Sequence, residues 1–334
     1  MIVRIVLIIA CVLQCACTQR DAIKFVGETQ GTSYHITLVA AAAVDKAALQ
    51  QRTERRLAEI DGALSNYRAD SELSRFNRAP IGEWIALSAD LYAVLQLSQQ
   101  ISVASDGAFD ITIAPLVQLW GFGPDGMHAD IPNAMQLQAA KAQVDYRQLQ
   151  LDPAAPRAKK LHALSIDVNG IAQGYTVDQL AALFAAAGHK NYLIEVGGEL
   201  RLVGTNAEKK PWRIAIEKPS DGLIAMQQAI VGSEIGVTTA GDYHDYFEKD
   251  GVRYSHTIDP RSARPIAHRL AAVTVVAATA ALADGWDTAL EVLGPEQGYA
   301  LAQHLQIAAY FIIRQGDTFE TRYTEAMQRY LDKF

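Results

Sequence analysis

A short segment near the carboxyl end of the chain holds two side chains whose spacing suits a divalent cation. Residues 281–294 read as the start of a helix, in which Asp284 and Thr288 stand four positions apart. Because an α-helix turns every 3.6 residues, both side-chain oxygens lie on one face. Mg²⁺ typically binds one or two protein oxygens and completes its shell with water and substrate phosphates. Taken alone, the same spacing also fits an N-capped helix whose threonine is purely structural.

Five further stretches are richer in glycine, hydroxyl and acid groups than ordinary core or surface segments. None of them matches a P-loop, a dinucleotide-binding fingerprint or a serine nucleophile elbow. Together with residues 281–294 they extend over most of the chain, so the fold has to bring them together. The five stretches are Gln30–Tyr34, Ser65–Leu73, Gly107–Thr112, Asp167–Tyr175 and Ser255–Pro260.

The composition is that of a globular protein and argues against nucleic acid as a partner. Of 334 residues, half are hydrophobic and a fifth are charged, which is enough apolar material for a large core. The formal net charge is −7, and no block of Lys or Arg provides a basic footprint for a nucleic-acid backbone. An acidic protein that handles phosphates needs a metal ion or backbone donors to screen their charge.

The amino terminus resembles a bacterial lipoprotein signal. Arg4 precedes the apolar run Ile5–Leu13, which is too short to span a bilayer, and a small residue stands directly before Cys17. We therefore expect residues 1–17 to be a lipoprotein signal peptide that includes the lipidated Cys17, and residues 18–334 to be the functional domain. The alternatives are an ordinary secretory signal and an uncleaved anchor. The expected location is the periplasmic side of the bacterial cell envelope, at the inner membrane, with outer-membrane sorting as the alternative.

The three cysteines (Cys11, Cys15 and Cys17) all lie in this leader. The remainder of the chain therefore contains no disulfide, no thiolate nucleophile and no zinc–thiolate site. Burial of the hydrophobic core has to provide its stability.

The apolar periodicity predicts an α+β domain. Residues 23–39 alternate as a hairpin about Gly31, and a spacing of three to four predicts helices further along. Residues 192–237 and 271–278 have strand patterns, 308–321 form a second hairpin, and a short helix closes the chain. The predicted helices are 44–64, 88–104, 133–145, 174–187, 280–293 and 295–304, and 152–160 is predicted to be a polar connection. Strand runs that do not alternate regularly with helices favour mixed or antiparallel sheets with packed helices, in one compact domain that could divide into two lobes.

Four motifs in this order resemble the ApbE-type flavin transferases, once described as thiamine-biosynthesis lipoproteins. The resemblance extends over residues 24–332. The motifs are Asp167–Asp178, Gly107–Asp110 followed by Pro115–Gly123, Ser255–Pro260, and Ala283–Thr288. The resemblance implies a single ApbE-like domain related to the T-fold. It also implies an FAD:protein FMN transferase that uses Mg²⁺, takes FAD as its substrate, moves FMN onto a threonine hydroxyl of an acceptor protein and releases AMP. The implied partners are exported flavin-acceptor subunits of membrane redox complexes.

The resemblance also assigns roles to individual residues. The backbone carbonyl of Gly170 joins Asp284 and Thr288 as a metal ligand, and His256 takes part in proton transfer from the acceptor threonine. Trp120 is expected in the core rather than in the site. The residues expected to bind FAD are Gln30, Tyr67, Ala108, Phe109, Asp110, Gln173, Thr176, Ile258 and Asp287.

Two other functions remain open at this point. An FAD pyrophosphatase would use the same metal and pocket, but with water in place of the threonine hydroxyl, and would give FMN and AMP. A flavin-binding lipoprotein without enzymatic activity would need no metal at the pyrophosphate. The intact pair Asp284 and Thr288, together with His256, argues against this last alternative.

Overall fold

The centre of the fold is an eight-stranded antiparallel sheet. The computed structural model describes residues 22–126, 128–218, 225–241, 246–316 and 318–332, so the predicted signal segment and Cys17 lie outside the described residues. Along the sheet the strands are β1 (Ala22–Thr29), β2 (Thr32–Val39), β6 (Tyr192–Val196), β7 (Glu199–Val203), β10 (Ile235–Gly241), β15 (Leu270–Ala277), β16 (Ala308–Gln315) and β17 (Thr318–Tyr323).

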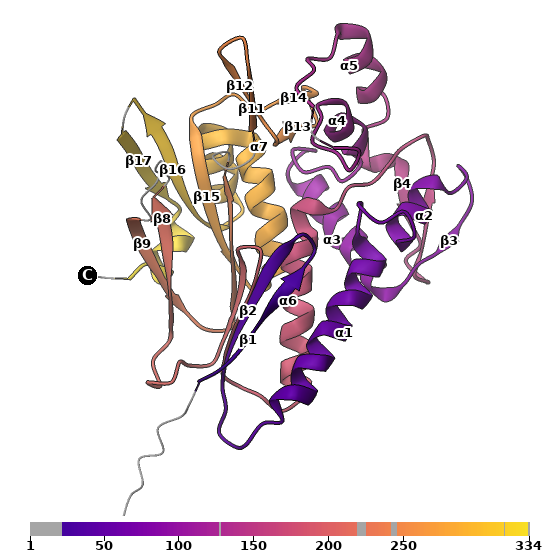
Figure 1. Ribbon diagram of the computed structural model, residues 1–334. Helices are drawn as coiled ribbons and strands as arrows, with labels where there is room; N and C mark the ends of the chain where they lie inside the picture. The colour runs from indigo at the N-terminus through magenta and orange to yellow at the C-terminus, as the bar shows by residue number, and fades with distance from the viewer. Residues whose placement is uncertain (1–21, 127, 219–224, 242–245, 317, 333–334) are drawn as a thin grey trace, which may run out of the picture.

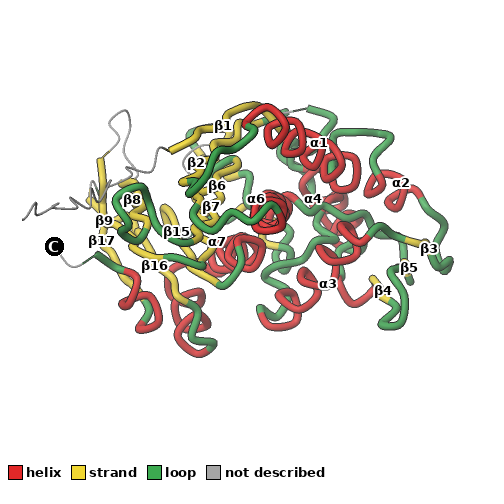
Figure 2. The backbone as a smooth tube through the Cα atoms, turned by 90° about the horizontal axis from the view of Figure 1, so that it is seen from below, coloured by secondary structure: helices red, strands yellow, loops and turns green. Residues whose placement is uncertain are grey.

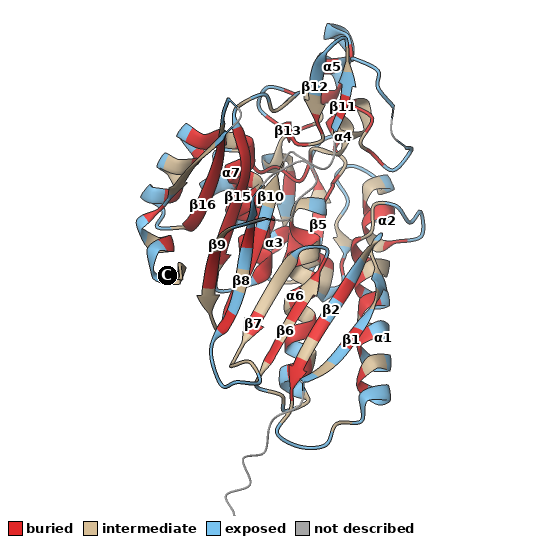
Figure 3. Ribbon diagram, turned by 60° about the vertical axis from the view of Figure 1, so that its left-hand side comes forward, coloured by how far each residue is buried: buried red, intermediate tan, exposed pale blue. Residues whose placement is uncertain are grey.

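The hairpin predicted over residues 23–39 is confirmed. Its two-residue turn, Gln30 and Gly31, has a positive φ at both positions, as tight hairpins require. Further along the sheet the alternation disappears in the interior strand β15, which is almost continuously apolar and buried. Such a strand is covered on both faces, and Figure 3 shows β15 and β16 as the most buried part of the sheet.

Two long helices cover one face of the sheet and carry much of the site. They are α6 (Asn169–Ala186) and α7 (Ala280–His304), which lie side by side against the strands (Figures 1 and 2). An outer layer packs on them, formed by α1 (Lys46–Leu64), α2 (Glu72–Arg78) and α3 (Ala89–Ala104). Buried Leu, Ile, Val and Phe side chains from both helical layers and from β15 and β16 make up the largest core cluster.

The opposite face of the sheet is covered by a hairpin and a terminal 3₁₀ segment. These are β8 (Trp212–Lys218), β9 (Ala225–Gly232) and η2 (Glu325–Tyr330), whose apolar side chains pack on the sheet in a second layer of core. Within the part of the chain that the structure describes, no helix is both long enough and apolar enough to cross a membrane.

A small subdomain sits at one end of α7. It comprises α4 (Ala114–Leu119), α5 (Ala134–Lys141), β11 (Tyr246–Lys249), β12 (Val252–Ser255), β13 (Ile258–Asp259) and β14 (Arg264–Pro265). Trp120 lies in its core, as expected: it is 1% exposed, and its indole N–H donates to the carbonyl of Ala263 over 3.0 Å.

The structure differs from the prediction at residues 152–160. This segment contains β5 (Arg157–Lys160), which pairs with β3 (Ile85–Ala86) and with β4 (Leu149–Leu151) after the 3₁₀ turn η1 (Tyr146–Gln148). The charged residues of this segment show no strand pattern in the sequence. In the structure Lys160 can be buried because its amine donates to the carbonyl of Asn77.

Helix boundaries also shift. The helix predicted from residue 174 begins at Asn169, with a kink at Gly170. The two helices predicted near the end form one element that is interrupted at Gly294, where φ is 76°, directly before Pro295.

Candidate active site

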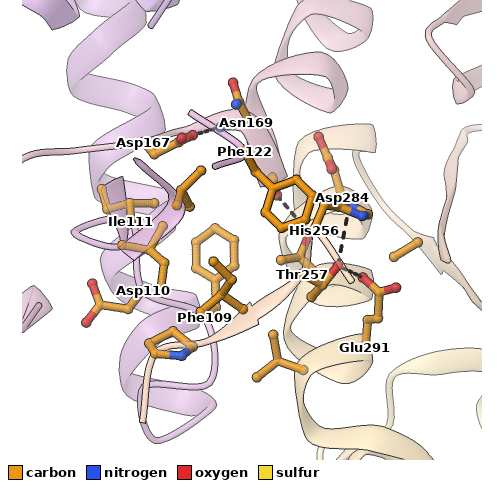
Figure 4. A pocket seen from close by; sticks show the side chains of 18 of the residues that line it. Phe109, Asp110, Ile111, Phe122, Asp167, Asn169, His256, Thr257, Asp284 and Glu291 are labelled. Carbon is orange, nitrogen blue, oxygen red and sulfur yellow. Dashed lines mark hydrogen bonds between the residues drawn. The ribbon is translucent and has the colours of Figure 1, made fainter. Parts of the chain in front are cut away.

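A cavity of about 720 Å³, here named the central cavity, opens where α6 and α7 meet the small subdomain. Its size falls in the range of small-molecule sites. Segments far apart in the sequence line it, namely 108–126, 167–173, 239–241, 256–260 and 284–292. Figure 4 shows Asp284, Thr257 and Glu291 on one side of it and Phe109 and Asp110 on the other.

The three predicted metal ligands lie together in the wall of the central cavity. Asp284 and Thr288 come from one turn of α7, and the Thr288 hydroxyl lies 3.4 Å from the carbonyl oxygen of Gly170. At Gly170 ψ is 20°, outside the helical range, so the helix is kinked there and begins regularly after it. The kink therefore places this carbonyl opposite α7.

The donor set fits Mg²⁺. A carboxylate, a hydroxyl and a backbone carbonyl are hard oxygen ligands of the kind that Mg²⁺ prefers. Among the described residues, no group of three or more His, Cys, Asp or Glu side chains is placed to hold a metal ion. A site with so few protein ligands leaves positions for water and phosphate, which suits Mg²⁺ better than zinc.

Several carboxyl groups are buried in this wall of the cavity, and their burial makes ionisation unfavourable. Burial raises the pKa of Asp284 to about 7, an effect to which the charge of Asp178 adds and which the backbone N–H of Gly174 opposes. Burial, followed by the charge of Asp284, raises the pKa values of Glu199 and Asp287 well above their usual range. One oxygen of Glu199 is buried without a hydrogen-bond partner among the described residues. A divalent cation would offset this concentration of negative charge.

An interhelical anchor fixes the start of α7. The carboxylate of Asp178, on α6, accepts from the backbone N–H groups of Ala280 and Ala281 over 3.0 and 2.9 Å. Two otherwise unsatisfied donors at the helix amino terminus are thereby paired. A second link joins the helices one turn later, where Gly174 N–H donates to Asp284 over 2.8 Å.

His256 lies at the cavity, in the turn between β12 and β13. The backbone N–H of Thr257 donates to the hydroxyl of Ser255 within this turn. The imidazole packs edge-on against the ring of Phe122, with 6.4 Å between the ring centroids. The Thr257 hydroxyl lies 3.4 Å from Nε2 of His256. The imidazole of His256 therefore faces the same cavity as the metal ligands.

Most of the predicted FAD-binding residues line the central cavity. Two do not: Gln30 and Thr176 lie outside its lining, where the Gln30 amide donates to the Thr176 hydroxyl over 2.9 Å. Tyr67 is 66% exposed and lines the cavity from its open side. The lining residues of the predicted set are Tyr67, Ala108, Phe109, Asp110, Gln173, Ile258 and Asp287.

The carboxylate of Asp110 has a structural role. It accepts from the backbone N–H and the hydroxyl of Thr112 and from the backbone N–H of Tyr146, over 2.7–3.0 Å. Figure 4 shows its oxygens directed away from the centre of the cavity. Asp110 therefore fixes the loop that carries Ala108 and Phe109, and these three bonds leave its carboxylate about one acceptor position for the predicted contact to FAD.

Sequence reasoning missed several lining residues, among them Glu199, Phe122 and Glu291. Helical spacing contained a signal for Glu291, since it follows Thr288 by three residues and so shares a face with the metal ligands. Glu199 gave no such signal. Its position depends on the turn at Gly197 and Gly198 between β6 and β7, both of which have positive φ.

The sequence matches one known protein family over most of its length. The sequence profile of the ApbE family matches residues 30–311, most of the chain and every segment of the central cavity. The chain belongs to the ApbE family. The family predicted from the four motifs is confirmed.

Two relatives that the chain matches over most of its length are named FAD:protein FMN transferase. The chain is 38% identical to an FAD:protein FMN transferase of Vibrio cholerae over 94% of each chain. It is 39% identical to one of Escherichia coli K12, over 88% of this chain and 85% of the relative. Among solved structures it resembles the Pseudomonas stutzeri flavinyl transferase ApbE, apo form, with a TM-score of 0.87, 42% identity and coverage of 94% and 98%. The α+β fold expected from the sequence is therefore confirmed.

Proposed function

We propose that this ApbE-family protein is an FAD:protein FMN transferase that uses Mg²⁺. It transfers FMN from FAD to a threonine hydroxyl of an acceptor protein, forms a phosphoester and releases AMP. The observation that carries this proposal is the convergence of Gly170, Asp284 and Thr288 with His256 on one cavity. The names of relatives that match nearly the whole chain support it.

The residues of the site divide the chemistry between them. Gly170, Asp284 and Thr288 would hold Mg²⁺, which supplies Lewis-acid stabilisation of the negative charge on the pyrophosphate. The apolar walls around Phe109 and Ile258 exclude water from the flavin nucleotide. Positioning and charge stabilisation are the main sources of rate in phosphoryl transfer.

His256 would act as the general base. The acceptor threonine loses its hydroxyl proton to His256, and its oxygen forms a bond to the phosphorus of the FMN half. The bond from that phosphorus to the bridging oxygen breaks, and this oxygen leaves with AMP. The imidazolium then returns its proton to solvent, so that each turnover consumes one FAD and one threonine hydroxyl.

An FAD pyrophosphatase is the second candidate. The same metal ligands and cavity would serve it if water took the place of the threonine hydroxyl as the nucleophile. Its products are free FMN and AMP. One assay separates the two activities from binding without turnover. The protein is incubated with FAD, MgCl₂ and an exported flavin-acceptor domain, and the products are separated by denaturing gel and by chromatography.

A fluorescent acceptor band together with AMP is the expected result. An acceptor domain whose target threonine is replaced by valine is the matched control and stays dark. Free FMN without a labelled acceptor would replace the proposal with hydrolysis, and unchanged FAD would leave only binding. The Asp284→Ala variant should label no acceptor, and retained turnover in it would remove the metal assignment.

We further propose that the protein works at the cell envelope, anchored by a lipid on Cys17, on acceptor subunits of membrane redox complexes. The apolar run before Cys17 supports this location. Mass spectrometry of co-expressed candidate acceptors, with a covalent FMN adduct as the expected finding, identifies the partner. The absence of an adduct on every exported acceptor would contradict it.

A further inference from the structure

A chain of hydrogen bonds leads from the imidazole of His256 into the protein. The Thr257 hydroxyl lies 3.4 Å from Nε2 of His256 and donates to Oε2 of Glu291 over 3.0 Å. Figure 4 shows the two bonds in succession, with Thr257 between the imidazole and the carboxylate. We name these three residues the His256 relay.

Glu291 is an unusual residue for its position. It lies on the buried face of α7 and is 4% exposed, whereas glutamate is rarely buried unless it is paired. Its backbone carbonyl lies 2.7 Å from Nε2 of His268, a contact that holds this turn of α7 against the strand-rich side of the site. This contact holds the turn of α7 in place, and the bond from the Thr257 hydroxyl to Oε2 keeps the carboxylate beside Thr257.

A hydroxyl group has one proton, and this fact gives the relay a direction. The Thr257 proton is used in the bond to Glu291, so its oxygen can only accept from a second partner. Nε2 of His256 lies 3.4 Å from this oxygen, and a hydrogen on Nε2 suits the arrangement because it can donate to it. In a neutral imidazole with the hydrogen on Nε2, the lone pair is on Nδ1.

We propose that Thr257 and Glu291 are positioning residues that hold His256 in the tautomer with hydrogen on Nε2. Nδ1 is then the atom that takes the proton from the acceptor threonine, which rests on the proposed transferase function. Phe122 supports this arrangement, because its edge-on contact restricts rotation of the imidazole. The logic is that of a base oriented by a buried carboxylate, here acting through an intervening hydroxyl.

Two substitutions of Glu291 test the tautomer directly. In Glu291→Gln the side-chain carbonyl still accepts from Thr257, so His256 should keep its hydrogen on Nε2. In Glu291→Leu the acceptor is lost, the Thr257 hydroxyl can donate to Nε2, and the hydrogen should move to Nδ1. The measurement is long-range ¹H–¹⁵N NMR on the full chain labelled at histidine, with His256→Gln to assign the signal. An unchanged Nε2–H signal in Glu291→Leu would overturn the relay.

A pair of substitutions at Thr257 tests the same idea through kinetics, also if Glu291→Leu does not fold. Thr257→Ser keeps the hydroxyl and should retain transfer within a few-fold. Thr257→Val keeps the shape without the hydroxyl and should lower kcat by about 10- to 100-fold, the usual cost of losing an outer-shell partner, with KM for FAD nearly unchanged. Equal kcat values for Ser and Val would refute the proposal, as would a loss confined to KM.

The two experiments separate this inference from the proposed function. If the unaltered protein labels no acceptor, the transferase assignment fails, whereas the NMR comparison of Glu291→Gln and Glu291→Leu still decides the relay. If the unaltered protein labels the acceptor normally and the tautomer of His256 is the same in Glu291→Leu, only the relay proposal fails.

Discussion

At the scale of single residues, the site combines groups that are costly to bury with groups that can lower that cost. Asp284 and Asp287 are both almost fully buried, and the charge of Asp284 raises the pKa of Asp287 in addition to burial. Such an arrangement is poorly suited to an empty protein and well suited to one that binds a cation. Two predictions follow from single side chains.

Protons should compete with Mg²⁺ at Asp284. The pKa of this carboxyl is raised to about 7, so below that pH protons increasingly occupy it and compete with the cation. Between pH 8 and pH 6 its ionised fraction falls about tenfold, from roughly 90% to roughly 10%. The Mg²⁺ concentration for half-maximal turnover should rise by about the same factor. Titration of activity with MgCl₂ at several pH values measures it, and a constant half-saturation would contradict the assignment.

Substitution of His256 should separate binding from chemistry. A positioned general base contributes about 10²–10⁴-fold to rate, so His256→Ala should slow transfer by a factor in that range. FAD should still bind, because the metal ligands and the apolar walls are unchanged. Rapid-mixing kinetics together with equilibrium titration of FAD fluorescence give the two quantities. Transfer at nearly the original rate would show that another group activates the threonine.

At the scale of elements, the sequence pattern predicted those helices and strands whose formation depends on regular apolar periodicity. The hairpin of β1 and β2 and the helices α1 and α3 have regular periodicity and were predicted to within a few residues. The strands β11, β13 and β14 were missed, since they have two to four residues each and are fixed by pairing and packing in the small subdomain. The strand Arg157–Lys160 was predicted as a connection because its charged sequence has no apolar alternation.

The same distinction applies to the site. Asp284 and Thr288 were found because their spacing matches one helical turn. The placement of Gly170 and His256 came from the family motifs and not from spacing. Glu199 has no signature in the sequence, since the antiparallel pairing of β6 and β7 alone brings it to Asp284.

The contact between α6 and α7 should tolerate no side chain at Gly174. A Cβ there would lie 2.5 Å from the carbonyl oxygen of Ala280 and 2.7 Å from Cβ of Asp284. Gly174→Ala should therefore lower the free energy of unfolding by about 1–3 kcal/mol, as overpacking typically does. It should also weaken Mg²⁺-dependent activity, because it displaces Asp284.

Gly62 provides the matched control for this prediction. It also lies in a helix, α1, but no atom stands within 4 Å of the position of its added Cβ. Gly62→Ala should be neutral or should stabilise by about 0.4–1 kcal/mol. Urea denaturation of the two variants compares them, and equal stabilities would mean that the helices adjust to the methyl group.

At the scale of the whole molecule, ligand binding should stabilise the fold through the two central helices. A ligand at 100 times its Kd adds about 2.7 kcal/mol to the free energy of unfolding. FAD with MgCl₂ should therefore raise the Tm, and Asp284→Asn should lose the part of the increase that depends on Mg²⁺. Thermal scans with FAD, with MgCl₂ and with both separate the contributions. An identical increase in the variant would place the metal elsewhere.

Attachment to the membrane should depend on Cys17 alone. Lipidation of this residue adds about 0.8 kcal/mol for each buried methylene, so replacing it releases the chain. Cys17→Ser should move the protein from the membrane fraction to the soluble fraction and abolish incorporation of a labelled fatty acid. Cys11→Ser is the control and should leave both unchanged. Membrane association that persists in Cys17→Ser would favour an uncleaved anchor.

The order in which the chain contributes to the site has a consequence for biosynthesis. Strand β15 occupies an interior position of the sheet, and α7, which follows it directly, supplies Asp284 and Thr288. A nascent chain that ends before residue 270 thus lacks both an inner strand of the sheet and two of the three expected cation ligands. Such an intermediate has no complete site for the nucleotide, so loading with flavin has to wait until residues 270–304 have been synthesised.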